Sequence, residues 1–299
     1  MDLEPYQSHI YRRFPDVLNQ RQPISPILQG WDSIVLDIGG EYIFRFPRRP
    51  DVKLQMEKEA CLLPKLAQAL PVPIPQFEFV WLEDPDPTAC FVGYRKLPGQ
   101  PLTPKAMTTS QITRQLAGFL SKLHRFSSQP GACNLPAGTS QGWRQSYQKF
   151  FDWIRSEVFP LLAEGARLAA TDLWQGFLNQ EENFHFQPVL IHADLVWEHI
   201  LFDPGRGCLT GVIDWGEAVI GDPALDFAGL FDIAGRDATE QVLCEYDGPV
   251  DQTFWQRIHF YRTILPFHSI RYGLLSGSKA HLKKGLQQLG ETAREGRTG

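Results

Sequence analysis

The chain has 299 residues, 43% of them hydrophobic and 21% charged, with a formal net charge of −5. This composition supports a packed interior and excludes a disordered or fibrous protein, and the length suits one large domain or two lobes. A negative net charge argues against a strongly basic face for nucleic acid. We therefore expect a globular protein with no nucleic-acid partner.

The five cysteines are widely spaced, and no two of them form a Cys-x-x-Cys pair. We therefore expect neither a disulfide scaffold nor a zinc finger, and we interpret the cysteines as those of a protein in a reducing compartment. The first residues lack the basic-then-apolar order of a signal peptide, and no run of about 18 apolar residues could span a bilayer. These features predict a cytoplasmic protein with no membrane partner.

The first third of the chain has strand and turn signals. Residues 33–38 and 41–46 are β-rich runs that flank Gly39-Gly40, which predicts a hairpin. Residues 53–70 follow with helical spacing of apolar residues. That stripe consists of Leu54, Ala60, Leu63, Leu66 and Leu70.

Prolines end this helix at residues 71–75, and two more strands are predicted at 76–82 and 90–97. Pro98-Gly-Gln-Pro101 then breaks the chain, so we place a lobe boundary between residues 97 and 98.

The remainder of the chain reads as mostly helical. Helices are predicted over 110–126, with Ser110 as the N-cap, and over 150–162, 171–178 and 254–289, around a β-rich island at 189–214. The pattern predicts an α+β fold with a small β-rich lobe (1–97) and a larger, mostly helical lobe (98–299). Ligand sites commonly lie between such lobes.

Chemistry-bearing residues gather in the β-rich island. An apolar strand leads to His192-Ala-Asp194, His199 follows five residues after Asp194, and a second hairpin strand ends at Asp214. Two carboxylates with a polar side chain between them are what phosphoryl transfer to a hydroxyl requires. One carboxylate orients the hydroxyl and accepts its proton, and the other, with a neutral ligand, holds Mg²⁺. Imidazole is a less usual magnesium ligand than an amide oxygen, so His199 is a departure that bears on metal preference.

At these residues the chain resembles the aminoglycoside phosphotransferase family, whose members have a two-lobed protein-kinase-like fold. His192-Ala-Asp194 matches the family's His-Gly-Asp, and Asp214-Trp-Gly216 stands at its Asp-Phe-Gly position. The segment 220–227 looks like its Asp-Pro…Asp-Phe segment. Further similarity lies at 42–47, 70–75 and 91–104, and the set is most similar to the branch that phosphorylates the double-primed ring of aminoglycosides.

The resemblance implies roles for individual residues. Asp194 corresponds to the catalytic base, and His199 and Asp214 correspond to the metal ligands. Arg45 falls where the family has a phosphate-binding lysine. Its expected partner on the following helix is Glu59, with Glu57 as the second choice. Arginine pairs with carboxylates and phosphates in a different geometry from lysine, so Arg45 is another departure.

The resemblance also implies a nucleotide site. Gly30 and Ser33 belong to the segment 29–33, which occupies the place of the nucleotide loop. Tyr94 and Lys96 lie in the stretch 94–97, which corresponds to the hinge between the lobes. The expected nucleotide is ATP or GTP, and the bulky Tyr94 resembles members that favour GTP.

Other residues near these motifs have plainer interpretations. We expect Asp226 to brace the catalytic loop, His124 to be structural, and Trp215 to pack in the core. Trp197 and Glu198 flank the catalytic loop and are candidates for substrate contact. An aromatic pocket for an apolar acceptor would draw on Trp153, Trp197, Phe260, Tyr261 and Phe267, each of which also suits ordinary packing.

The sequence therefore predicts an enzyme that moves the γ-phosphate of a nucleoside triphosphate to a hydroxyl of a small molecule, with an aminoglycoside as the first candidate. Related macrolide phosphotransferases combine similar features, and residues 261–273 contain no acid to attract a polycation. A macrolide is therefore an alternative acceptor. A non-catalytic nucleotide-binding protein is a second alternative, and a protein kinase ranks below both. The oligomeric state is not predicted.

Overall fold

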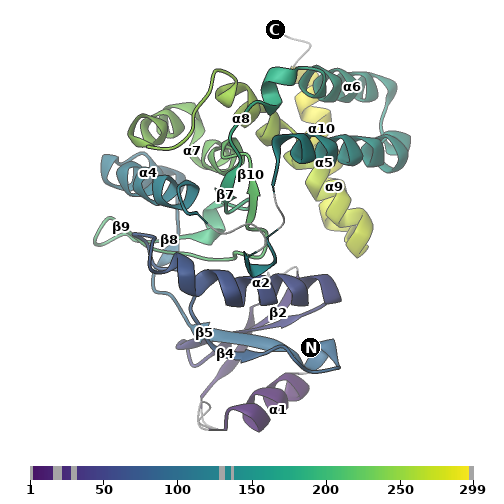
Figure 1. Ribbon diagram of the computed structural model, residues 1–299. Coiled ribbons are helices and arrows are strands. Elements are labelled where there is room, and N and C mark those ends of the chain that lie inside the picture. The colour runs from purple at the N-terminus through teal and green to yellow at the C-terminus, as the bar shows by residue number, and fades with distance from the viewer. Residues whose placement is uncertain (1–2, 16–21, 28–31, 128–131, 136–137, 296–299) are drawn as a thin grey trace.

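The computed structural model describes residues 3–15, 22–27, 32–127, 132–135 and 138–295. Its first part is a five-stranded antiparallel sheet in the order β1-β2-β3-β5-β4. The strands are β1 Ile24–Ile27, β2 Ser33–Ile38, β3 Tyr42–Pro47, β4 Phe77–Trp81 and β5 Phe91–Arg95. Helix α1 (Glu4–Arg13) accompanies this sheet at one end of the molecule, and most helices lie at the other end (Figure 1).

The predicted hairpin is confirmed as β2 and β3, with Ile38 opposite Tyr42. Gly39 and Gly40 both have positive φ (64° and 73°), a conformation that residues with a Cβ adopt only at a cost. Side chains alternate along β3, so its phenylalanines pack into the core beneath α1 while Arg45 points to the opposite face.

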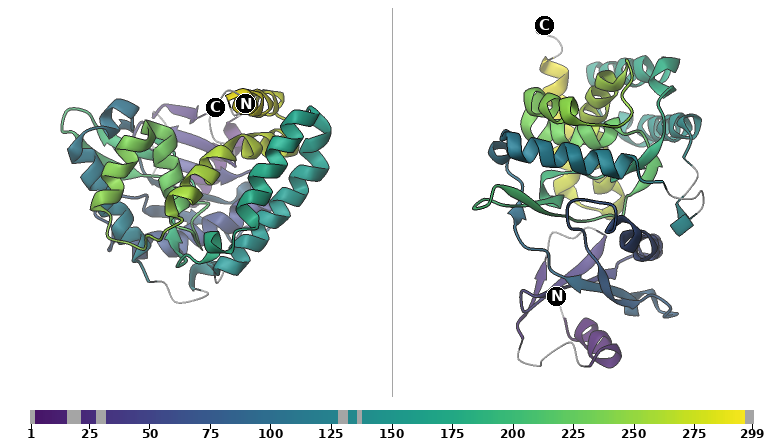
Figure 2. Two further views of the ribbon diagram at one scale, coloured as in Figure 1. Left: turned by 90° about the horizontal axis from the view of Figure 1, so that it is seen from above. Right: turned by 60° about the vertical axis from the view of Figure 1, so that its left-hand side comes forward.

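Helix α2 (Pro50–Leu66) covers that opposite face and lies at the junction between the sheet and the remaining helices (Figures 1 and 2). It begins and ends earlier than predicted. Its first turns pack Val52 and Met56 against the sheet. Its last turns bury leucines in the main hydrophobic core, which belongs mostly to the larger, helical part of the molecule that follows the sheet in the chain. Leu54 is 61% exposed, so its assignment to the buried stripe is wrong. Leu54 lies on the side of the helix opposite Leu63, because nine residues at 100° each amount to half a turn beyond two full turns.

A disulfide joins Cys61 of α2 to Cys133, with 5.2 Å between their Cα atoms. Cys133 lies in a short turn that follows the first long helix of the larger part. The expectation of reduced cysteines is therefore wrong for this pair, and the cysteine pattern no longer supports a reducing compartment. Sequence spacing does not reveal a pair 72 positions apart, because only the fold brings the two thiols together.

The larger part contains eight helices among its described residues, together with short strands. The helices are α3 Pro104–Met107, α4 Ser110–His124, α5 Ser140–Trp153, α6 Glu164–Leu178, α7 Ala224–Glu245, α8 Phe254–Thr263, α9 Leu265–Ser276 and α10 Lys279–Glu295. None of the helices in the described ranges is both long enough and apolar enough to cross a membrane.

Several helix boundaries differ from the sequence prediction. The N-cap of α4 is Thr109 rather than Ser110. The helix expected at 150–162 is the end of α5, followed by a π-helical turn at Ile154–Val158. Helix α7 was not predicted, and it is interrupted at Gly235, whose φ is 77°.

The β-rich island forms two small antiparallel sheets, β7 with β10 and β6-β8-β9. These strands are β6 Gln100–Pro101, β7 Val189–Ile191, β8 Ile200–Asp203, β9 Cys208–Val212 and β10 Val219–Gly221. The loops that leave β7 and β9 carry the predicted catalytic residues.

Candidate active site

Asp194, His199 and Asp214 come together at the ends of the short strands. Asp194 follows β7, His199 directly precedes β8, and Asp214 follows β9. One potential ligand atom from each of the three lies within 4.8 Å of the other two. The β8–β9 hairpin produces this proximity, because Ile200 pairs with Val212 and so aligns the start of one strand with the end of the other.

The two ring nitrogens of His199 have different partners. Nδ1 lies 2.8 Å from the backbone carbonyl oxygen of Asp194, and Nε2 lies 3.6 Å from Oδ2 of Asp214. A carbonyl only accepts hydrogen bonds, so Nδ1 carries the proton in the neutral ring and Nε2 presents its lone pair toward Asp214. This is the tautomer that a metal-binding histidine adopts when its second nitrogen donates to an oxygen.

Asp226 braces the loop that carries Asp194, as predicted. Its fully buried carboxylate accepts the backbone N–H groups of His192 (3.0 Å) and Ala193 (2.8 Å). His124 lies 3.1 Å from the same carboxylate and 2.6 Å from the hydroxyl of Tyr246. The interpretation of His124 as a satisfied structural histidine is confirmed, and its contact reaches the catalytic loop itself.

Two residues of the site have an unusual backbone conformation. Ala193 has φ = 66° and Asp214 has φ = 63°, both in the left-handed region that favours glycine. The aminoglycoside phosphotransferase family, which this chain resembles, has glycine at the position of Ala193. This chain therefore has a Cβ at a position whose backbone conformation favours a residue without one.

The two carboxylates differ in their electrostatics. Burial raises the pKa of Asp194 to about 6, with a contribution from the nearby Asp214 and an opposing one from His199. Partial loss of hydration would also raise the pKa of the half-exposed Asp214, but Arg45 and His199 outweigh it and lower that pKa. The pair thus combines a carboxylate that takes up a proton readily with one that stays ionised.

Arg45 connects the sheet to this site. Its Nη1 donates to both carboxylate oxygens of Glu59, at 3.1 and 3.0 Å, and its Nη2 lies 3.5 Å from Oδ1 of Asp214. The guanidinium is almost fully buried, and although burial opposes its charge, the two carboxylates raise its pKa. Glu59 is therefore the partner, while Glu57 pairs with Lys53 instead.

The predicted nucleotide-site residues are only partly brought together. Gly30 lies outside the described residues. Ser33 is buried at the start of β2, and its Oγ has no hydrogen-bond partner among the residues that the structure describes. Tyr94 is buried on β5, where burial raises its pKa to about 12. Lys96 pairs through its Nζ with Asp37 of β2 at 2.6 Å.

The neighbouring aromatic residues divide into core and surface. Trp215 is fully buried and donates from Nε1 to the carbonyl of Val212, which confirms it as a core residue. Phe260, Tyr261 and Phe267 are at most 4% exposed. They belong to the core, so the suggestion that they line an acceptor pocket is wrong. Trp153 is partly buried against that core, whereas Trp197 beside the catalytic loop is 47% exposed.

Lys58 and Gln55 of α2 were missed by the sequence reasoning. Nζ of Lys58 donates to the carbonyls of Gly216 (2.6 Å) and Ala218 (2.7 Å), and Nε2 of Gln55 donates to Glu217 (2.8 Å). Lys58 directly precedes Glu59 and Gln55 lies about one turn before it on α2. Their closeness to Glu59 in the sequence was the available signal that they lie near the site. The fold alone reveals that their partners follow Asp214.

The donor set fits a divalent cation. Two carboxylates offer hard oxygen ligands, and Nε2 of His199 offers a nitrogen lone pair beside Asp214. His199 and Asp214 can hold the ion while a carboxylate oxygen of Asp194 accepts a proton.

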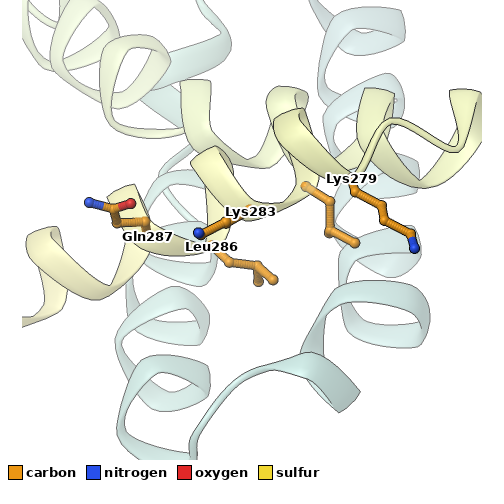
Figure 3. A pocket seen from close by; sticks show the side chains of 5 residues that line it. Lys279, Lys283, Leu286 and Gln287 are labelled. Carbon is orange, nitrogen blue, oxygen red and sulfur yellow. The ribbon is translucent and has the colours of Figure 1, made fainter.

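A surface hollow of about 530 Å³ lies elsewhere, along α10. Figure 3 shows Lys279, Lys283, Leu286 and Gln287 along its wall. The hollow has two lysines and no carboxylate among its lining residues, so we assign it no part in the chemistry.

Comparison with known proteins shows which proteins this chain resembles in sequence and fold. Residues 23–254 match the model of a family described as the phosphotransferase enzyme family. Viomycin phosphotransferase of Streptomyces vinaceus is 29% identical over 204 residues, which cover 64% of this chain and 66% of that protein.

Solved structures extend the likeness over nearly the whole chain. The GDP and kanamycin complex of APH(2″)-IIIa is 28% identical, with a TM-score of 0.86 and 99% of each chain covered. Macrolide 2′-phosphotransferase MphH from Brachybacterium faecium is 23% identical, with a TM-score of 0.75. The match covers 96% of this chain and 98% of the MphH chain, and it shows similarity of fold.

Proposed function

Since the chain belongs to the phosphotransferase enzyme family, we propose that Asp194, His199, Asp214 and Arg45 form the site at which it phosphorylates a small molecule. The donor is a nucleoside triphosphate and the acceptor group is a hydroxyl. The observation that carries the proposal is the convergence of the Asp194, His199 and Asp214 ligand atoms within 4.8 Å of one another.

Asp194 acts as the base in this proposal. Its carboxylate orients the acceptor hydroxyl and takes its proton as the hydroxyl oxygen bonds to the γ-phosphorus. The bond from that phosphorus to the bridging oxygen breaks, and the nucleoside diphosphate leaves. His199 and Asp214 would hold Mg²⁺, which screens the phosphate charge when it is bound.

Arg45 and its neighbours would hold the nucleotide. The guanidinium has a fixed fork of donors for phosphate oxygens, and Glu59 fixes its orientation. Gly30, Ser33, Tyr94 and Lys96 belong to the segments that we assign to nucleotide binding. We further assign residues 1–97 to the nucleotide and 98–299 to catalysis and the acceptor. ATP and GTP are both candidates, and the GDP complex of APH(2″)-IIIa supports a lean to GTP.

An aminoglycoside is the first candidate acceptor, because the kanamycin complex of APH(2″)-IIIa resembles this chain over 99% of its length. A macrolide is the second candidate. The observation in its favour is that residues 261–276, from the last turn of α8 through α9, carry no acidic residue, while Arg262 and Arg271 are exposed there. A polycationic acceptor gains nothing from such a surface.

The test is a panel of acceptors with the purified protein, Mg²⁺ and either ATP or GTP. Aminoglycosides, macrolides and viomycin should each be assayed for a product heavier by one phosphoryl group. A phosphorylated product from any of them supports the proposal and identifies the acceptor class. Nucleotide binding without transfer to any acceptor, including simple amino alcohols, would favour a non-catalytic nucleotide-binding protein.

A further inference from the structure

Lys58 ties α2 to the turn that presents Asp214. The turn comprises residues 214–218, between β9 and β10, and Nζ of Lys58 donates to two of its backbone carbonyls, those of Gly216 and Ala218. Gly216 and Ala218 are buried, so those carbonyls have limited access to solvent. A buried carbonyl that loses its partner is left without a hydrogen bond, which is unfavourable, so Lys58 is a strong constraint on the path of the turn.

The turn needs such a constraint. Asp214 has the left-handed φ of 63°, and its carboxylate is half-exposed, with long contacts of 3.5 Å to Arg45 and 3.6 Å to His199. Below it, Trp215 anchors the turn in the core through Val212. The buried Trp215 fixes the part of the turn that packs on the core. The carbonyls of Gly216 and Ala218, which accept from Lys58, lie on the side of the turn that faces α2.

Helix α2 itself does not depend on Lys58. Leu62, Leu63 and Leu66 bury its second half in the main core, and the Cys61–Cys133 disulfide fixes it to the larger part of the molecule. Loss of Lys58 should therefore loosen the turn, which Gln55 still contacts through the exposed Glu217, and leave the helix in place. Glu59, the next residue, orients Arg45, so two adjacent residues of one fixed helix act on two components of the site.

We propose that Lys58 is a positioning residue for Asp214, which sets the metal-binding carboxylate by holding the carbonyls of Gly216 and Ala218. The inference rests on the proposed function, because it takes Asp214 as a metal ligand. Outer residues that orient metal ligands typically change metal affinity by about 10- to 100-fold when they are replaced.

The test compares Lys58→Met with wild type by titrating Mn²⁺ into the protein saturated with a non-hydrolysable nucleoside triphosphate, with free Mn²⁺ read by electron paramagnetic resonance. Methionine keeps the apolar stem and removes the donors. We expect Mn²⁺ affinity to fall about 10-fold or more. Nucleotide affinity measured without metal should be retained, which also shows that the variant is folded. Lys58→Arg should restore much of the Mn²⁺ affinity.

Lys53→Met is the matched control, since Lys53 lies on the same helix and pairs only locally with Glu57. It should bind Mn²⁺ as wild type does. If Lys58→Met does not fold, Lys58→Gln, which keeps one amide donor group, should show a smaller loss of Mn²⁺ affinity. Wild-type Mn²⁺ affinity in a folded Lys58 variant lacking the ammonium, even with a lower melting temperature, overturns the proposal and leaves the proposed function standing. Absence of Mn²⁺ binding in the wild type overturns both.

Discussion

Nη2 of Arg45 lies 3.5 Å from Oδ1 of Asp214, although 169 positions separate the two residues in the chain. The same guanidinium holds both oxygens of Glu59 through Nη1. One buried side chain on β3 thus contacts both helix α2 and the carboxylate of Asp214, for which we propose a metal-binding role. This contact joins the five-stranded sheet of the first part of the chain to the loop after β9 in the larger, mostly helical part.

Replacing Arg45 with lysine should weaken nucleotide use more than it weakens the fold. Lysine keeps the positive charge, but its single ammonium lacks the planar fork that serves Glu59 and Asp214 at once. We expect the KM for the nucleoside triphosphate to rise about 10-fold, equivalent to about 1.4 kcal/mol. Steady-state kinetics with varied nucleotide measures this. Arg236→Lys, at an exposed ion pair on α7, is the control, and an unchanged KM in Arg45→Lys would contradict the role of the guanidinium.

Replacing His199 with asparagine should change which metal supports the reaction. Mg²⁺ prefers oxygen ligands, whereas Mn²⁺ binds nitrogen ligands more readily. The ratio of the Mg²⁺-supported rate to the Mn²⁺-supported rate should therefore rise in His199→Asn. Parallel titrations of the two metals at fixed nucleotide measure that ratio. An identical ratio in wild type and variant would show that His199 does not contact the metal.

Replacing Ala193 with glycine should stabilise the protein. The left-handed φ of 66° costs alanine about 1–2 kcal/mol, and glycine recovers this while losing about 0.5–1 kcal/mol to its more flexible unfolded state. We expect the free energy of unfolding to rise by about 0.5–1 kcal/mol in urea denaturation. Ala169→Gly, at an exposed position within α6, should lower it by about 1 kcal/mol. A loss of stability in both variants would mean that Ala193 is not strained.

Replacing His192 with glutamine should flatten the acid dependence of stability. Burial lowers the pKa of His192 to about 4, and the unfolded histidine titrates near 6.5. The unfolded state then takes up the proton first, so the contribution of the neutral ring is present above pH 6.5 and is lost as the pH falls toward 4.

The lost contribution is on the order of 3 kcal/mol. Urea denaturation between pH 7 and pH 4 should show a shallower decline in His192→Gln than in wild type. His185→Gln, at an exposed histidine, is the control. Equal slopes in the three proteins would contradict a neutral buried His192.

Local patterns predicted the elements and motifs well, because hairpin turns, strand alternation and strand-end carboxylates are set by neighbours in sequence. The β2–β3 hairpin and the strand-end position of Asp214 are examples, whereas the Arg45–Glu59 pair was expected only from the family resemblance. Contacts between distant segments were missed. The Cys61–Cys133 disulfide and the hold of Lys58 on the turn after Asp214 depend on how α2 packs on the larger part, and no local spacing encodes that packing.

Aromatic residues show the same limit. Phe260 and Tyr261 occur at a spacing that suits either a pocket or a core, and periodicity does not distinguish the two. Their burial against α5 and α6 decides the question, and that depends on helix packing. The separation of the two lobes at residues 97 and 98 stays a prediction.

The most direct test is phosphoryl transfer by Asp194→Asn, measured in a single turnover with a γ-labelled nucleotide and an acceptor that the wild type phosphorylates. Asparagine keeps the shape of the side chain and cannot accept the proton, so the transfer rate should fall by about 10²- to 10⁴-fold while nucleotide binding is largely retained. Asp237→Asn, at an exposed position of α7, should transfer phosphate at the wild-type rate. Transfer by Asp194→Asn at the wild-type rate would contradict the assignment of Asp194 as the base.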